Sequence, residues 1–273
     1  MNLREKADQI RVETFSVLHR AGGGHYGGCM SCVEILTVLY YDLLRFDPHH
    51  RDDPARDRFI LAKGHSGPTL YTILADLDCF DKSLLAQLDQ NGGALPKHVD
   101  RMKVPGIEYS SGPLGQGLSV AAGMAVGLRD SGYARSKVYC LLGDGELDEG
   151  QIWEAAMCAA HYKIDNLIAI VDWNHQQIDG PVEKVMSLDP LDKKWEAFGW
   201  NVIAVDGHNV EALAAAFRTA HTCSGKPSVL LADTIKGKGI SFMEGNYRWH
   251  SGYTTEDQYK TGIADLTAGR SLA

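Results

Sequence analysis

Short runs of consecutive apolar residues alternate along the chain with stretches in which apolar residues recur at helical spacing, most regularly in the second half. The apolar runs predict strands at 58–62, 138–142, 167–172, 201–205 and 228–234. The helical spacing predicts helices at 1–20, 31–44, 115–129, 149–161, 188–198, 210–223 and 256–266, and another that starts at about residue 68. Residues 90–112 contain several glycines and prolines and are predicted to be irregular.

Strands that are apolar on both sides and alternate with helices are typical of a parallel sheet that is covered on both faces. The predicted fold class is therefore α/β, with a doubly wound, mostly parallel sheet and helices on both faces. No internal repeat, low-complexity stretch or flexible linker divides the 273 residues, so a single domain over 1–273 is expected. In such a sheet, a ligand binds at the carboxyl ends of the strands.

Composition and charge exclude several classes of protein. The net charge is −8 and no run of Lys or Arg stands out, so a nucleic-acid partner is not expected. No apolar stretch approaches the roughly 18 residues of a membrane helix, and residues 1–20 lack the apolar core of a secretory signal. The six cysteines lie mostly in apolar surroundings, as expected in a reducing compartment. A cytoplasmic protein without a membrane partner is expected.

The strand at 138–142 runs directly into Gly143-Asp144-Gly145. The two glycines let the backbone turn sharply and approach a ligand, while Asp144 presents a carboxylate at the strand end. We expect the next helix to begin there, with its free N–H groups facing the same crevice. The following strand ends near Asn174, one strand-helix-strand crossover later, so the oxygens of Asp144 and Asn174 are expected to converge on one cation.

Two side-chain oxygens and a backbone carbonyl would leave positions for phosphate oxygens and water, as is usual for Mg²⁺ beside a diphosphate. The alternative is an ordinary turn followed by an unrelated strand-end Asn, because Gly-Asp-Gly alone is a common sequence. Asn174 at the end of the next strand favours the metal site. The sequence does not distinguish Mg²⁺ from Ca²⁺ or Mn²⁺, which are expected to substitute for it.

Four segments in series resemble the transketolase family of thiamine-diphosphate enzymes, over nearly the whole chain. Gly143-Asp144-Gly145 followed by Asn174 resembles the thiamine-diphosphate signature. Residues 24–28 (Gly-His-Tyr-Gly-Gly), 57–65 (Asp-Arg-Phe-Ile-Leu-Ala-Lys-Gly-His) and 111–119 (Ser-Gly-Pro-Leu-Gly-Gln-Gly-Leu-Ser) are similar to the transketolase segments in order. The resemblance implies the thiamine-diphosphate-binding fold and transfer of a two-carbon ketol unit between sugar phosphates, with thiamine diphosphate and Mg²⁺ as cofactors.

The resemblance also implies roles for individual residues. Asp144 and Asn174 would be metal ligands through their side chains, and Gln176 through its backbone carbonyl. Gly112 and Leu114 would contact the aminopyrimidine of the cofactor, Gly145 would offer a backbone N–H to its diphosphate, and Gly143 would also be a cofactor-binding residue.

Two acids five residues apart follow the Gly-Asp-Gly turn. By the resemblance, Glu149 would face a subunit interface and Glu154 would belong to an acidic network that links two cofactor sites. The alternative is that both acids simply support the positive end of the helix dipole.

Four histidines complete the candidate site. Ketol transfer needs protons to move and oxygen charge to be stabilised, and imidazole performs both tasks near neutral pH. By the resemblance, His25 and His98 would contact substrate hydroxyls, while His65 and His250 would reach the diphosphate and the reacting carbonyl region. A solvated loop histidine is the alternative for His98 and His250.

Cys29 and Cys32 have the spacing of a redox or metal pair, but no second pair or zinc-spaced histidine accompanies them. Because they begin an apolar helix, buried packing is the preferred interpretation.

By the resemblance, the chain matches only the first part of a full-length transketolase. The pyrimidine-binding domain, with the glutamate that activates the cofactor, and the C-terminal domain are therefore expected on a partner chain, in an α2β2 heterotetramer. Two alternatives stay open. One is another thiamine-diphosphate enzyme subunit, such as a deoxyxylulose-phosphate synthase relative or a 2-oxoacid dehydrogenase α chain. The other is a non-catalytic cofactor-binding subunit.

Overall fold

The computed structural model describes residues 2–268 and contains a five-stranded parallel sheet in the order β1-β2-β3-β5-β4. The strands are β1 Arg58–Leu61, β2 Val138–Gly143, β3 Leu167–Trp173, β4 Asn201–Asp206 and β5 Ser228–Asp233. All five predicted strands are therefore present, close to the predicted ends. The α/β fold class with a parallel sheet is confirmed.

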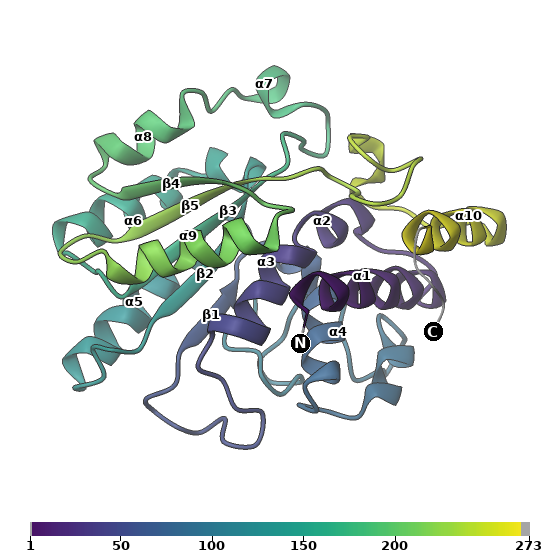
Figure 1. The fold of residues 1–273 in the computed structure, drawn as a ribbon, viewed down its shortest axis with the longest axis horizontal. Helices are drawn as coiled ribbons and strands as arrows, with labels where there is room; N and C mark the ends of the chain where they lie inside the picture. The colour runs from purple at the N-terminus through teal and green to yellow at the C-terminus, as the bar shows by residue number, and fades with distance from the viewer. Residues whose placement is uncertain (1, 269–273) are drawn as a thin grey trace.

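Helices cover both faces of the sheet (Figure 1). The α-helices are α1 Leu3–Arg20, α2 Tyr26–Ser31, α3 Val33–Val38, α4 Gly67–Asp76, α5 Gly117–Asp130, α6 Gly150–His161, α7 Val182–Val185, α8 Leu191–Ala197, α9 Val210–Thr222 and α10 Glu256–Thr267. Short 3₁₀ or π turns are η1 Leu39–Leu43, η2 Gly64–Ser66, η3 Lys82–Gln87, η4 Gly145–Asp148 and η5 Tyr247–His250.

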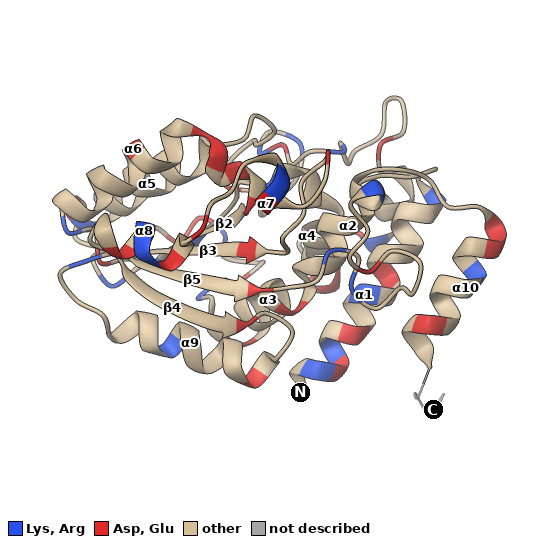
Figure 2. Cartoon of the chain, turned by 90° about the horizontal axis from the view of Figure 1, so that it is seen from above, with Lys and Arg blue, Asp and Glu red and all other residues tan. Residues whose placement is uncertain are grey.

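Successive strand residues alternate between two separate cores, as the period of a β-strand requires. In β2, Tyr139 and Leu141 pack with α1, α3, α4 and α9, while Val138 and Cys140 pack with α5, α6 and α8. Figure 2 shows α9 on one side of the sheet and α5 and α6 on the other. The strands point toward α1, α2 and α10, so the carboxyl ends of the strands face this second group of helices.

Two boundaries differ from the prediction. The helix expected at 31–44 begins at Tyr26 and is interrupted at Cys32, so that α2, α3 and η1 replace one helix. Gly27 and Gly28 lower the helix propensity of this segment, and tertiary contact overrides that preference. A Cβ at Gly27 would lie 2.7 Å from Cγ of Lys236, so only glycine allows α2 to pack this closely on the chain that follows β5.

The turn after β2 also differs. The helix expected directly after Gly145 is preceded by the 3₁₀ turn η4, and α6 begins at Gly150. The first free N–H group of the turn, that of Gly145, is taken by Oδ1 of Asp144 at 2.8 Å. Within residues 2–268, none of the helices combines the length and apolar character that crossing a membrane requires.

Candidate active site

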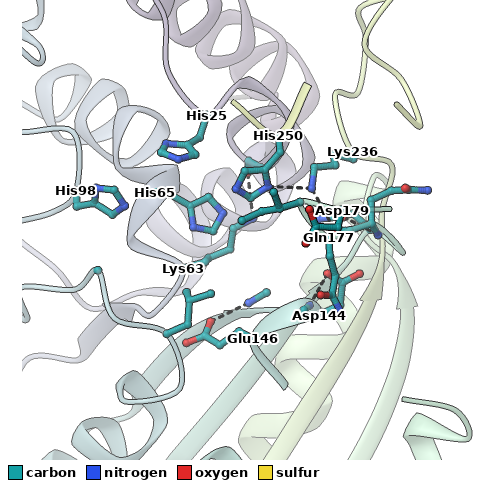
Figure 3. Close-up of a pocket in the computed structure, with 18 residues that line it drawn as sticks. His25, Lys63, His65, His98, Asp144, Glu146, Gln177, Asp179, Lys236 and His250 are labelled. Carbon is teal, nitrogen blue, oxygen red and sulfur yellow. Dashed lines mark hydrogen bonds between the residues drawn. The ribbon is translucent and has the colours of Figure 1, made fainter. Parts of the chain in front are cut away.

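A cavity of about 310 Å³ opens at the carboxyl ends of β1, β2, β3 and β5 (Figure 3). It brings together eleven of the thirteen residues that the sequence marks as site candidates. They are His25, His65, His98, Gly112, Leu114, Gly143, Asp144, Gly145, Asn174, Gln176 and His250. Lys63, Glu146, Gln177, Asp179 and Lys236 also line the cavity, and no motif in the sequence assigned them a role.

The four candidate histidines form one cluster on one wall of the cavity. The ring centroid of His25 lies 5.2 Å from that of His65, 5.5 Å from His98 and 5.4 Å from His250. The rings of His65 and His250 are 5.3 Å apart. They come from four separate segments: His25 precedes α2, His65 is in η2, His98 lies in the irregular stretch before α5, and His250 ends η5. His98 and His250 are therefore not isolated surface histidines.

Burial keeps these imidazoles neutral near pH 7. Burial, together with the charges of neighbouring basic groups, lowers the pKa of His25 to about 4 and that of His250 to about 3. The pKa of His65 is held well below the usual value, mainly by burial, and that of His98 is lowered for the same reason. A neutral imidazole carries one N–H donor and one acceptor, so the cluster can both donate to a hydroxyl and accept a proton.

We therefore expect the His25 ring to stay neutral until the pH falls to about 4. The unfolded chain binds this proton more tightly, so the free energy of unfolding should decrease as the pH falls from about 6.5 toward 4. Histidine-ring NMR of the chain measures the titration directly. His50 is the internal control, since its hydrogen bond to Asp47 raises its pKa. Titration of His25 near 6.5 would contradict the desolvated cluster.

The opposite wall carries oxygen ligands. Asp144 is 2% exposed, and its carboxylate accepts N–H groups from Gly145 at 2.8 Å and His175 at 2.5 Å. Asn174 is 7% exposed and accepts the N–H of Gln176 through Oδ1 at 3.2 Å. The backbone carbonyl of Gln176 accepts Nζ of Lys236 at 3.1 Å, while Oε1 of Gln176 is buried without a partner. One carboxylate, one amide oxygen and one carbonyl therefore face the same part of the cavity.

Electrostatics link this wall to Lys236. Burial and the charge of Asp172 raise the pKa of Asp144 to about 6, although Lys236 and the N–H groups of Gly145 and His175 oppose that shift. Burial lowers the pKa of Lys236 to about 8, although Asp144 opposes that shift. Nothing in the local sequence of Lys236 marks it, and its position three residues beyond β5 was the only available signal.

At the floor of the cavity, Lys63 forms a buried ion pair with Asp172, which joins the ends of β1 and β3. The side chain of Lys63 is 1% exposed and that of Asp172 is 0% exposed. Lys63 also donates to the carbonyl of Gly28 at 3.0 Å, and Asp172 accepts the hydroxyls of Ser31 at 2.6 Å and Thr234 at 2.5 Å. The pair therefore ties β1, β3, β5 and α2 together below the histidines.

Two candidates lie outside the cavity. Glu149 and Glu154 are exposed, at the start and on the outer face of α6. Glu154 borders a groove between α5 and α6. Their assignment to an interface and an acidic network stays a prediction.

Cys29 and Cys32 are fully buried, and burial raises the pKa of their thiols to about 11 and 12. This agrees with packing rather than redox chemistry. Among residues 2–268, no group of three or more His, Cys, Asp or Glu side chains is arranged to hold a metal ion by itself. The Asp144 wall has the composition of a site that a bound phosphate would complete.

Comparison with known proteins agrees with this geometry. The family model described as "Transketolase, thiamine diphosphate binding domain" matches residues 3–264. The chain belongs to the transketolase family. The domain of this family that binds thiamine diphosphate thus accounts for nearly the whole chain.

Two relatives named as transketolase subunits have about the same length as this chain. A 6-deoxy-6-sulfo-D-fructose transketolase subunit of Clostridium sp. is 44% identical, over 97% of this chain and 96% of its own length. One subunit of an apulose-4-phosphate transketolase of Phocaeicola vulgatus is 40% identical, over 97% of this chain and 94% of its own length.

Among solved structures, the transketolase of Campylobacter jejuni matches with a TM-score of 0.90 and 32% identity. The match covers 97% of this chain but only 43% of that transketolase. Two relatives named as subunits therefore have the length of this chain, while this transketolase of known structure is more than twice as long.

Proposed function

We propose that this chain is the diphosphate-binding subunit of a two-chain transketolase. With Mg²⁺ and thiamine diphosphate, the complex transfers a two-carbon ketol unit from a ketose phosphate to an aldose acceptor. The observation that carries the proposal is the cavity at the strand ends. It sets the oxygen ligands of Asp144, Asn174 and Gln176 against a cluster of four neutral imidazoles.

The donor set suits Mg²⁺ beside a diphosphate. Hard oxygen ligands from Asp144, Asn174 and the Gln176 carbonyl leave places for phosphate oxygens and water. Lys236 lies at the same carbonyl and adds a second positive group for a diphosphate. The buried, unpartnered Oε1 of Gln176 and Nδ1 of His25 also support a polar ligand in the cavity. Ca²⁺ and Mn²⁺ fit the same ligands.

When bound, thiamine diphosphate supplies the carbanion chemistry of ketol transfer. The chain holds and orients that cofactor: Gly112 and Leu114 line the cavity on the side assigned to the aminopyrimidine, and Gly143 and Gly145 lie on the side assigned to the diphosphate. The neutral imidazoles of His25 and His98 donate hydrogen bonds to the hydroxyls of the transferred unit. His65 and His250 are assigned to proton movement at the reacting oxygen.

A partner chain supplies what this cavity lacks. The carboxylates that line it are Asp144, assigned to the metal, Glu146, which accepts two backbone N–H groups, and Asp179. We therefore assign the acid that activates the cofactor ring to a pyrimidine-binding partner, within an α2β2 heterotetramer. Glu149 and Glu154 on α6 are assigned to the face that meets the other subunits.

The substrate is assigned only by class. The residues of this cavity face the transferred two-carbon unit, so contacts to the anionic tail of the sugar are assigned to the partner. Two of the relatives are named for 6-deoxy-6-sulfo-D-fructose and apulose 4-phosphate. A ketose with a phosphate or sulfonate tail is the substrate class that we propose.

The test is to tag this chain in its native cell and purify it with Mg²⁺ and thiamine diphosphate present. We expect a stoichiometric companion of similar size, and ketol transfer that neither chain performs alone. Donors should include ketose phosphates and a sulfonated ketose, with pyruvate as the control for other thiamine-diphosphate chemistry. A homo-oligomer that binds the cofactor without transferring a ketol unit would contradict the proposal, as would consumption of pyruvate.

A further inference from the structure

Glu146 is a buried acid at the centre of the site that the proposed chemistry does not use. It is 2% exposed, lies in η4 two residues after Asp144, and lines the cavity. Its Oε1 accepts the N–H of Gly115 at 2.9 Å, and its Oε2 accepts the N–H of Gly143 at 3.0 Å. Figure 3 shows this carboxylate below Lys63 with its bond toward the strand end. One side chain therefore joins the loop at 111–117 to the turn that carries Asp144.

The loop at 111–117 is held firmly at both ends. At its start, Ser111 donates to the carbonyl of Leu61 at 2.6 Å, at the end of β1. At its finish, Gly117 packs so closely on β1 that a Cβ there would lie 2.4 Å from Cβ of Ala62. These anchors hold the two ends of the loop against β1, which pairs with β2 in the sheet, and leave residues 112–116 between them.

The middle of the loop is held by its contact with η4 and the start of α6. Gly115 has a φ of +85°, and a Cβ there would lie 2.6 Å from Cβ of Glu149, so the loop sits directly on the start of α6. The bond from Gly115 to Glu146 then fixes the distance from the loop to the Asp144 turn. Gly112 and Leu114, which face the cavity, move with Gly115.

We propose that Glu146 is a positioning residue that fixes the distance between the loop at 112–114 and the Asp144 turn, so that both ends of thiamine diphosphate bind at once. This inference rests on the proposed function, because it uses the assignment of the loop to the aminopyrimidine and of the turn to the diphosphate. Only a carboxylate offers two acceptor oxygens to two N–H groups. Glutamine offers one, and places a donor against the other N–H group.

Glu146→Gln should free the loop at 111–117 to move, while β2 should keep its position. Gly143 is held in the sheet opposite Asp172, whereas Gly115 lies in the loop and is held by its bond to Glu146 and its contact with Glu149. The experiment is calorimetric titration of the co-purified complex of this chain and its partner with two probes, each in excess Mg²⁺. Thiamine diphosphate spans both ends of the site, while inorganic pyrophosphate occupies the diphosphate end alone.

We expect Glu146→Gln to weaken thiamine diphosphate binding about tenfold and pyrophosphate binding by less than about threefold. At saturating cofactor, kcat should stay within about twofold of the unsubstituted complex, while the KM for the cofactor rises. Gly115→Ala strains the same loop without altering Glu146, so it should reproduce the selective loss. Glu211→Gln, at an exposed acid in the first turn of α9, is the matched control.

Unchanged affinity for thiamine diphosphate in a folded Glu146→Gln complex would overturn the positioning role. An equal loss for both probes, or a loss that follows a fall in Tm, would assign Glu146 to stability alone and also overturn it. Failure of the unsubstituted complex to bind thiamine diphosphate would overturn the proposed function, and this inference with it. The outcomes are therefore distinguishable.

Discussion

Replacing Asp144 with alanine is expected to weaken metal-dependent binding of thiamine diphosphate at least about tenfold, or ~1.4 kcal/mol, and to abolish ketol transfer. Asp144 is the only carboxylate assigned to the metal, and it is almost completely buried. Its pKa is raised to about 6 by burial and by Asp172, although Lys236 and two backbone N–H groups oppose that shift, so a further cation would stabilise the ionised side chain. Binding of Mg²⁺ would supply that cation.

The measurement is a titration of the complex with thiamine diphosphate at several Mg²⁺ concentrations. Asp144→Asn keeps the shape of the side chain and removes its charge, so it should lose the Mg²⁺ dependence as alanine does. Asp257→Asn, at an exposed acid of α10, is the control. Because both substitutions also disturb the acceptor of the Gly145 and His175 N–H groups, the Tm of each cofactor-free variant is measured beside its affinity. Unchanged affinity in a folded Asp144→Ala variant would remove the metal assignment.

The second large effect concerns stability. Lys63→Met should lower the free energy of unfolding by about 3–5 kcal/mol, because it leaves the carboxylate of Asp172 buried without its cation. Burial opposes the charge on Lys63, but Asp172 outweighs that effect and raises the pKa of Lys63. Asp172 is likewise buried, and Lys63 with two hydroxyl donors holds its pKa below the usual value. Urea denaturation of the chain measures the loss.

A double-mutant cycle separates the pair from its surroundings. Lys63→Met combined with Asp172→Asn removes both charges, so the double variant should be more stable than the sum of the single losses predicts. The pKa of Asp172 is lowered in the folded chain, so its contribution is present above the unfolded value and lost as the pH falls. The deficit of Lys63→Met should therefore shrink below about pH 4. Strictly additive losses would contradict a coupled buried pair.

The two substitutions probe different layers of one site. Asp144 faces the cavity and is assigned to the metal, whereas Asp172 lies beneath it and holds β1, β3, β5 and α2 together. At 144 the loss of cofactor affinity is expected to exceed any loss of stability, whereas at 63 the loss of stability comes first. The two results therefore distinguish Asp144, which is assigned to ligand binding, from the Lys63–Asp172 pair, which supports the residues around the cavity.

Local sequence determined the strands and most helices of this protein. Strands that are apolar throughout, such as 138–142, are stable only when both of their faces are buried. Because these strands alternate with helices along the chain, they pack as a parallel sheet with helices on both faces. The position of Asp144 at a strand end followed from the same pattern, since a Gly-Asp-Gly turn directly after a buried strand must lie at the carboxyl edge. Asn174, at the end of the next strand in the chain, was expected there for the same reason.

Contacts between residues that are distant in the sequence were determined only by the tertiary structure. It placed Lys236 and the Lys63–Asp172 pair at the site, because contacts between residues distant in sequence depend on which strands become neighbours. It also gathered His98 and His250 beside His25, which left their rings partly buried and neutral rather than solvated. The helix start at Tyr26 was decided in the same way, since Gly27 and Gly28 disfavour a helix locally but permit close packing on Lys236. Periodicity and strand ends can be read from the sequence because they are local, whereas pKa values and ion pairs depend on burial, which only the folded chain creates.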